Sequence, residues 1–283
     1  MAKGLFEQIV DRTVTEILET DIQGITKLGD YCLYDCKNLT NIILPDTINE
    51  IGIESFGNCS SLQEITIPKN ITSLPERIFS YCTSLSKVNF KSNVTNYSDF
   101  CFAGCSSLTT IDFPDEPITI GNNVFANSGI VSLSIPNNSV IGKAVCYLCS
   151  KLVDVSLPNS LTTIKEETFQ TCSSLTNIKL PENLISIEKY AFNNCNNLLN
   201  ITIPSKVNSI GANVFNTITT AIFNQPAGME VTLPTAGSST GMFYHKTARN
   251  LTVYTDNETI KNYDYATDNV TVTLYHLDGT LWE

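Results

Sequence analysis

The sequence predicts an α/β solenoid in which about eight coils of 23 residues stack on one another. Three observations predict it: a slot usually held by cysteine returns every 23 residues, a leucine follows three positions later, and a short alternating segment that ends in proline comes next. Chance does not produce eight copies, so the 283 residues form stacked coils rather than two globular domains. The cysteine slot falls at Cys36, Cys59, Cys82, Cys105, Ser128, Cys149, Cys172, Cys195 and Ile218.

The residues of each segment explain which structural element of the coil it forms. Alternating apolar residues such as Ile65 and Ile67 point inward from a strand, while the residues beside them point outward. Pro68 ends that strand, because proline cannot donate to a strand ladder. A bend follows at steps such as that before Gly52, where a side chain would be in the way or φ is positive. A short turn of α or 3₁₀ helix then buries a phenylalanine such as Phe79.

This pattern, C-x-x-L-x-x-I-x-L-P-x-x-L/I-x-x-I-G-x-x-A-F, resembles the BspA-like, treponemal-type leucine-rich repeat over residues 28–218. The resemblance implies a right-handed, curved leucine-rich-repeat solenoid of parallel strands. Such solenoids occur in bacterial surface and phage-associated proteins and act in adhesion or protein recognition, without catalysis. One coil departs from the pattern: it has Ser128 in the cysteine slot and Cys146 in the phenylalanine slot, and it is two residues shorter.

We expect three parts in the chain. Residues 1–27 form an N-terminal cap, because apolar residues at i, i+3 and i+4 spacing over 5–18 predict an amphipathic helix of about four turns. Residues 28–218 are the solenoid. Residues 219–283 form a β-rich C-terminal cap with strands over 251–254 and 270–275, because the last coil would otherwise expose its apolar layer.

The ten cysteines predict buried, reduced thiols. Their spacing follows the repeat and gives no set of zinc ligands; Cys146-x-x-Cys149 is a lone pair in core slots. No signal peptide precedes the acidic residues of the first dozen positions, so we expect folding in the cytoplasm, in agreement with reduced thiols. The final compartment stays open between the cytoplasm, a bacterial surface and a phage particle.

Composition and charge exclude several function classes. A net charge of −11 without a basic cluster argues against nucleic acid, and no apolar run is long enough to span a membrane. The sequence indicates no cofactor, metal site or catalytic group. The two histidines, His245 and His276, form no metal-binding or nucleophile pair by spacing, and a hydrolase that uses either one is a minor alternative.

The outward positions of the strands are the candidate binding surface. They carry short polar or charged side chains and no aromatic ladder, which argues against a platform on which sugars stack. Tyrosines at the coil corners, Tyr34, Tyr81 and Tyr147, offer a second surface. The candidate partner-binding residues are Asn41, Glu64, Lys87, Asp112, Asp154, Asn177 and Lys179.

A group of aromatic residues near the C-terminus has two interpretations: a ligand patch, or rings that close the end of the core, which we favour. The group comprises Phe243, Tyr244, His245, Tyr254, Tyr263, Tyr265, Tyr275 and Trp282.

The function predicted from these features is a non-enzymatic, monomeric recognition or adhesion module that presents a solenoid surface to a protein or cell-surface partner. The alternatives are a structural spacer and an intracellular protein–protein scaffold.

Overall fold

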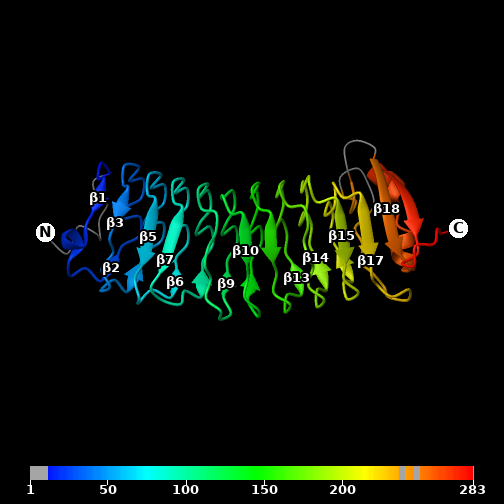
Figure 1. Cartoon of the computed structure of the whole chain (residues 1–283), viewed down its shortest axis with the longest axis horizontal. Coiled ribbons are helices and arrows are strands. Elements are labelled where there is room, and N and C mark those ends of the chain that lie inside the picture. The colour runs from blue at the N-terminus through cyan, green and yellow to red at the C-terminus, as the bar shows by residue number, and fades with distance from the viewer. Residues whose placement is uncertain (1–11, 236–239, 245–248, 283) are drawn as a thin grey trace. The chain divides into compact units, whose positions relative to one another are not determined.

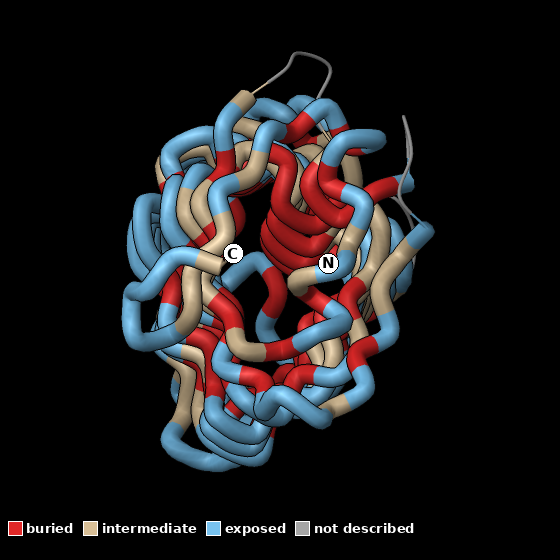
Figure 2. Tube along the Cα trace, turned by 90° about the vertical axis from the view of Figure 1, so that its right-hand side faces the viewer, coloured by how far each residue is buried: buried red, intermediate tan, exposed pale blue. Residues whose placement is uncertain are grey.

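The computed structural model describes residues 12–235, 240–244 and 249–282, in two compact units, Met1–Cys149 and Ser150–Glu283. Each unit is built from short parallel strands that lie side by side in successive coils (Figure 1). Buried residues gather inside the coils and exposed residues cover the outside (Figure 2). With about 11 turns of roughly 23 residues, the chain is a parallel-strand β-solenoid.

Two rows of strands run through the first unit, and paired strands are one coil apart. Lys27 pairs with Glu50, 23 residues later, whereas in the shortened coil Thr119 pairs with Val140. The first row contains β1 (Glu16–Ile17), β3 (Asn41–Ile42), β5 (Glu64–Ile67), β7 (Lys87–Phe90) and β10 (Ser132–Ser134). The second contains β2 (Lys27–Leu28), β4 (Glu50–Ile51), β6 (Ser73–Leu74), β8 (Asn96–Tyr97), β9 (Thr119–Ile120) and β11 (Val140–Ile141).

The second unit also contains two rows of parallel strands. One sheet has the order β13-β14-β16 and the other β15-β17-β18-β19, with all neighbours parallel. The strands are β12 (Asp154–Ser156), β13 (Thr163–Ile164), β14 (Ser186–Ile187), β15 (Asn200–Ile203), β16 (Ser209–Ile210), β17 (Thr220–Phe223), β18 (Arg249–Thr255) and β19 (Val270–Tyr275).

The structure corrects the predicted α/β class, because helices are few. Among the described residues they are α1 (Glu258–Lys261) and two 3₁₀ helices, η1 (Glu19–Ile22) and η2 (Tyr265–Asp268). Where a helical turn was predicted, left-handed residues such as Arg77 and Tyr81, with φ of 55° and 58°, interrupt the backbone. Every other N–H group there bonds to the next coil, as Phe79 does to the Cys101 carbonyl at 3.0 Å, and those between bond within the turn, as Ser80 does to the Arg77 carbonyl at 3.0 Å.

The predicted N-terminal helix is wrong over its described part, and its first half lies outside the described residues. Glu16 and Ile17 form β1, which pairs with β3, and η1 follows it. Ile17 and Ile22 are both buried. A helix would break the ladder bonds that this segment makes with the first predicted coil, such as Ile43 N–H to the Ile17 carbonyl at 3.0 Å.

Phenylalanine rings stack along the inside of each unit. In the first unit Phe56, Phe79, Phe102 and Phe125 follow one another with ring centroids 5.5, 5.6 and 5.7 Å apart. In the second, a run from Phe169 ends at Phe243 and Tyr265. These spacings slightly exceed the strand separation of about 4.8 Å, so each ring lies on the one before it.

The cysteines are buried free thiols, as predicted. They also donate hydrogen bonds, which the sequence did not reveal: Cys82 Sγ lies 3.0 Å from the Phe56 carbonyl oxygen, and Cys105 Sγ lies 3.1 Å from that of Phe79. Burial raises the pKa of Cys82, and it raises that of Cys195 to about 12. The thiol is therefore a second donor to a carbonyl of the preceding coil, which already accepts a backbone N–H, as the Phe56 carbonyl does from Cys59 at 3.2 Å.

The glycine at the second bend is required by close approach rather than by a positive φ. A Cβ on Gly121 would overlap Asp99, and one on Gly211 would overlap the backbone of Lys189. At these two positions, therefore, adjacent coils lie too close together to leave room for a Cβ atom.

A buried polar cluster closes the second unit at its C-terminal end. The Arg249 guanidinium donates to the carbonyls of Ile218, Phe215 and Phe243. Asp268, fully buried, accepts from the Tyr263 hydroxyl at 2.9 Å. Burial lowers the pKa of Arg249 to about 10, although the negative charge of Asp268 acts to raise it. Part of the predicted C-terminal cap thus closes the core, as we favoured.

We predict that Phe102→Ala lowers the free energy of unfolding by about 3–5 kcal/mol, because it leaves a cavity between two stacked rings. Ile43→Ala is the matched control: its side chain is 45% exposed, and the expected change is below about 0.5 kcal/mol. Urea denaturation followed by circular dichroism measures both. Equal losses in the two variants would contradict the stacking account.

We predict that the native protein at pH 8 resists a thiol–disulfide reagent and that all ten thiols react after unfolding in guanidinium. Burial keeps the thiols out of contact with the reagent, and raised pKa values such as that of Cys82 keep them protonated. Absorbance of the released chromophore counts the reactive thiols. Rapid reaction of several thiols in the folded protein would show that the cysteine ladder is open to solvent.

Candidate functional site

Three of the candidate residues lie on strands of the first row in the N-terminal unit. In each unit, we call the outward-facing side chains of the strand row that carries the candidate residues the outward row. Glu64 on β5 and Lys87 on β7 are exposed and are register partners on adjacent strands. Asn41 on β3 is half-buried, and its amide donates to Glu16 Oε1 at 2.9 Å. Opposite charges thus alternate along this part of the row.

Asp112 borders a shallow hollow of about 340 Å³ in the first unit, here called the N-terminal hollow. The side-chain amides that border this hollow already donate hydrogen bonds within the chain. Asn89 donates to Thr66 Oγ1 at 3.5 Å, and Asn93 donates to Glu116 Oε1 at 3.0 Å. The Tyr97 hydroxyl, which borders the same hollow, is buried without a partner among the described residues.

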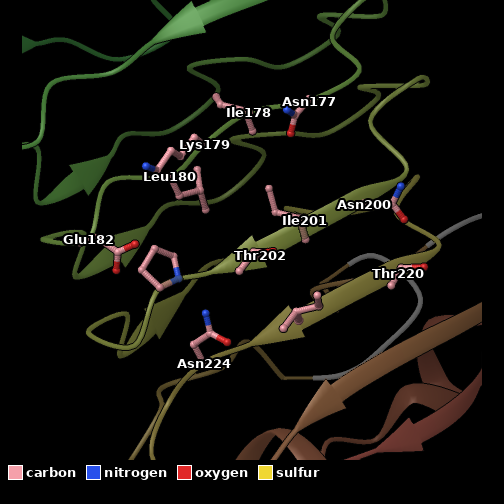
Figure 3. A pocket seen from close by; sticks show the side chains of 12 residues that line it. Asn177, Ile178, Lys179, Leu180, Glu182, Asn200, Ile201, Thr202, Thr220 and Asn224 are labelled. Atoms are coloured by element: carbon pink, nitrogen blue, oxygen red, sulfur yellow. The ribbon is translucent and has the colours of Figure 1, made fainter. Parts of the chain in front are cut away.

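Asp154 lies exposed on β12, while Asn177 and Lys179 border a second hollow, of about 410 Å³. We call it the C-terminal hollow. Figure 3 shows side chains from three successive coils around it: Asn200 and Thr220 project where neighbouring strands begin, and Glu182 and Asn224 lie beyond the strand ends. The complete lining is Asn177, Ile178, Lys179, Leu180, Glu182, Asn200, Ile201, Thr202, Pro204, Thr220, Ile222 and Asn224.

The amides of the C-terminal hollow differ from those of the N-terminal hollow, because their side chains make no hydrogen bond to the part of the chain that the structure describes. This holds for Asn177, Asn200 and Asn224, all of which are exposed. Lys179 and Glu182 add one charge of each sign. The hollow therefore offers both donors and acceptors with little net charge.

The outward row extends further than the sequence predicts. In register, Thr202 faces Ile222, Ile222 faces Tyr254, and Tyr254 faces Tyr275. Tyr254 and Tyr275 are half-buried, and their rings stack at 5.2 Å. The prediction that this surface lacks an aromatic ladder concerned the strands up to Thr202, and these two tyrosines lie beyond it, on β18 and β19. The alternating Leu251-Thr252-Val253-Tyr254 segment could have revealed this extension of the row, had its strand been aligned with the preceding coils.

The aromatic group near the C-terminus divides between two roles. Phe243 and Tyr265 are buried in the ring stack, whereas Tyr254 and Tyr275 belong to the outward row. Trp282 stacks on His276 with centroids 3.6 Å apart, and its indole N–H donates to the Thr255 carbonyl. Neither of the two interpretations applies to the whole group.

Around His276 the described residues provide an aspartate and an aromatic ring. His276 Nδ1 lies 2.9 Å from Asp256 Oδ1, and the ring packs on Trp282; His245 lies outside the described residues. Among the described residues, no group of three or more histidine, cysteine, aspartate or glutamate side chains could hold a metal ion. No helix in the described ranges is long and apolar enough to cross a membrane.

Comparison with known proteins agrees with this architecture. A model of the BspA type leucine rich repeat region matches residues 26–144 and 139–271, in six copies. A leucine-rich repeat protein from Bacteroides ovatus is 23% identical, with a TM-score of 0.52 over 93% of this chain and 84% of that chain. The pneumococcal vaccine antigen PcpA is 18% identical, with a TM-score of 0.54 over 95% of this chain and 78% of that chain.

At these identities the two structures show a shared fold. No curated protein matches the sequence. The family model, however, covers well over half of the residues, and the period that it describes is the one that sets the strand register. The chain therefore belongs to the BspA-type leucine-rich repeat family.

Proposed function

We propose that the chain is a non-enzymatic recognition module that presents its outward row to a protein or cell-surface partner in a bacterial or phage-associated setting. The observation that carries this proposal is the C-terminal hollow, whose lining includes three amides without partners in the described chain, among them the predicted residue Asn177, together with the predicted Lys179. Groups that a protein does not use internally are available to a ligand.

The scaffold beneath this surface supports the proposal. The strands that carry the outward row also carry inward residues such as Ile201 and Ile203, which are buried in the coil interior. Burial holds these inward residues in place. It thereby also holds the outward residues between them, because successive side chains of one strand point to opposite faces. Binding then costs little conformational entropy.

The charges of the row support selectivity for a partner. The row carries charges of both signs, with acids at Glu64, Asp112 and Asp154 and bases at Lys87 and Lys179, so a partner must match a pattern rather than a single sign. Together with the net charge of −11, this pattern disfavours nucleic acid. Under this proposal residues 28–218 provide most of the surface, and the segments 1–27 and 219–283 close the ends, the latter also extending the row.

We predict that reversing the five charges of the row lowers binding to bacterial envelope fractions at least tenfold. The variant carries Glu64→Lys, Lys87→Glu, Asp112→Lys, Asp154→Lys and Lys179→Glu. The matched control reverses three exposed acids and two exposed bases elsewhere and should bind like the unmodified chain; its changes are Glu19→Lys, Lys69→Glu, Asp115→Lys, Lys206→Glu and Glu230→Lys.

Sedimentation with envelopes, compared with pull-down from cytosolic lysate, measures this binding. Equal envelope binding by both variants would overturn the role of the outward row. Absence of any partner for the unmodified chain would favour a structural spacer, and partners confined to the cytosol would favour an intracellular scaffold.

A further inference from the structure

We infer that the C-terminal hollow and the adjoining tyrosines form a binding site for an uncharged oligosaccharide. The inference rests on the proposed recognition function and specifies the chemistry of the partner. It follows from three features that meet on one face of the second unit: free amides, stacked rings and a balanced charge.

The hydrogen-bonding groups of the hollow match those of sugar hydroxyls. Each side-chain amide of Asn177, Asn200 and Asn224 offers two N–H donors and a carbonyl acceptor, and Thr202 and Thr220 add hydroxyls. A pair of neighbouring sugar hydroxyls can donate to an amide oxygen and accept from its N–H group at the same time. The amides are available for this role, since none is bonded within the described chain.

An apolar strip runs beside these polar groups. Ile222 borders the hollow, Tyr254 is its register partner on the next strand, and Tyr275 follows. Tyr254 and Tyr275 stack on each other at 5.2 Å and are only half-buried, so part of each ring faces solvent. A pyranose ring has one face rich in C–H groups, and such a face packs on an aromatic ring or an isoleucine.

The length of the surface suits a chain of sugars rather than a single one. The residues lie on five successive coils, from Asn177 through Asn200, Thr220 and Tyr254 to Tyr275. At about 4.8 Å per strand, these five positions span about 19 Å. Asn200 and Thr220 are register partners, as are Tyr254 and Tyr275, and Tyr254 lies two residues beyond the register partner of Thr220. A linear oligosaccharide that crosses the strands obliquely would therefore meet amides and a hydroxyl first and the two rings after them.

Charge and backbone geometry disfavour the other ligand classes. Lys179 and Glu182 offset each other at the hollow, so neither an anionic glycan nor a basic segment gains from it. An extended peptide that adds to a sheet needs a free strand edge. Here β17 and β18 are each paired on both sides, so Thr220 and Tyr254 lie on strands without a free edge.

The first unit provides an internal comparison. The N-terminal hollow has a similar volume, but the amides of Asn89 and Asn93 are already bonded within the chain, and Asp112 adds a charge that no lysine of its lining balances. We therefore place the sugar site at the C-terminal hollow alone.

Binding of neutral tetrasaccharides, measured by isothermal titration calorimetry on the full chain, tests the inference. The probes are cellotetraose, chitotetraose, mannotetraose and a poly-N-acetyllactosamine tetrasaccharide. We expect at least one to bind, with affinity reduced tenfold or more by Asn200→Ala and by Tyr254→Ala. Asn89→Ala is the matched control and should leave affinity unchanged. Tyr254→Leu removes the ring but keeps an apolar side chain. If this variant loses affinity for the tetrasaccharide while its circular dichroism spectrum is unchanged, the cause is the missing ring and not unfolding.

Failure of all four probes to bind, or equal affinity of Asn200→Ala and the unmodified chain, would overturn the inference. Periodate treatment of envelopes separates this outcome from failure of the proposed function. If binding to envelopes persists after the sugars are oxidised, the partner is not a glycan of this kind, while the recognition function stands. If periodate treatment of the envelopes abolishes binding, and the Asn200→Ala variant also fails to bind untreated envelopes, the inference is supported.

Discussion

The requirement that each coil lie on its neighbour at the strand spacing underlies every other feature of this protein. It places equivalent side chains in ladders, so the phenylalanine rings follow one another at 5.5 to 5.7 Å in the first unit and each thiol reaches a carbonyl of the preceding coil. It requires glycine at Gly121, where a Cβ would meet Asp99. The same spacing brings the outward side chains of successive coils close enough to act as one surface.

Much of the fold could be predicted from the sequence, because a ladder repeats its residue type at a fixed interval. The cysteine, leucine and proline slots, and the coil shortened by two residues, all match the observed register. The turn conformation could not be predicted, since left-handed φ values occur at residues as different as Arg77, Phe100 and Ala144. The N-terminal helix was predicted wrongly because apolar residues such as Ile17 and Ile22 fit a helix as well as a strand followed by a 3₁₀ turn.

The candidate site could be predicted only in part. Alternation along the strands identified Asn177 and Lys179 as outward residues, but it did not show that three amides around them lack partners in the described chain. That property depends on which side chains neighbour each amide in space, as the bonded Asn93 shows. Tyr254 and Tyr275 were recognised as part of an aromatic group but not assigned to the outward row, because β18 and β19 lack the cysteine and leucine slots and follow a long connection after β17.

The central claim is that partners bind the outward row rather than the coil corners. Hydroxyl-radical footprinting with mass spectrometry tests it directly, because it reports the solvent exposure of individual tyrosine side chains with and without bound envelope material. The account predicts protection of Tyr254 and Tyr275 and unchanged labelling of Tyr31 and Tyr81, which are 46% and 58% exposed. Protection of Tyr31 and Tyr81, with Tyr254 and Tyr275 still labelled, would contradict it.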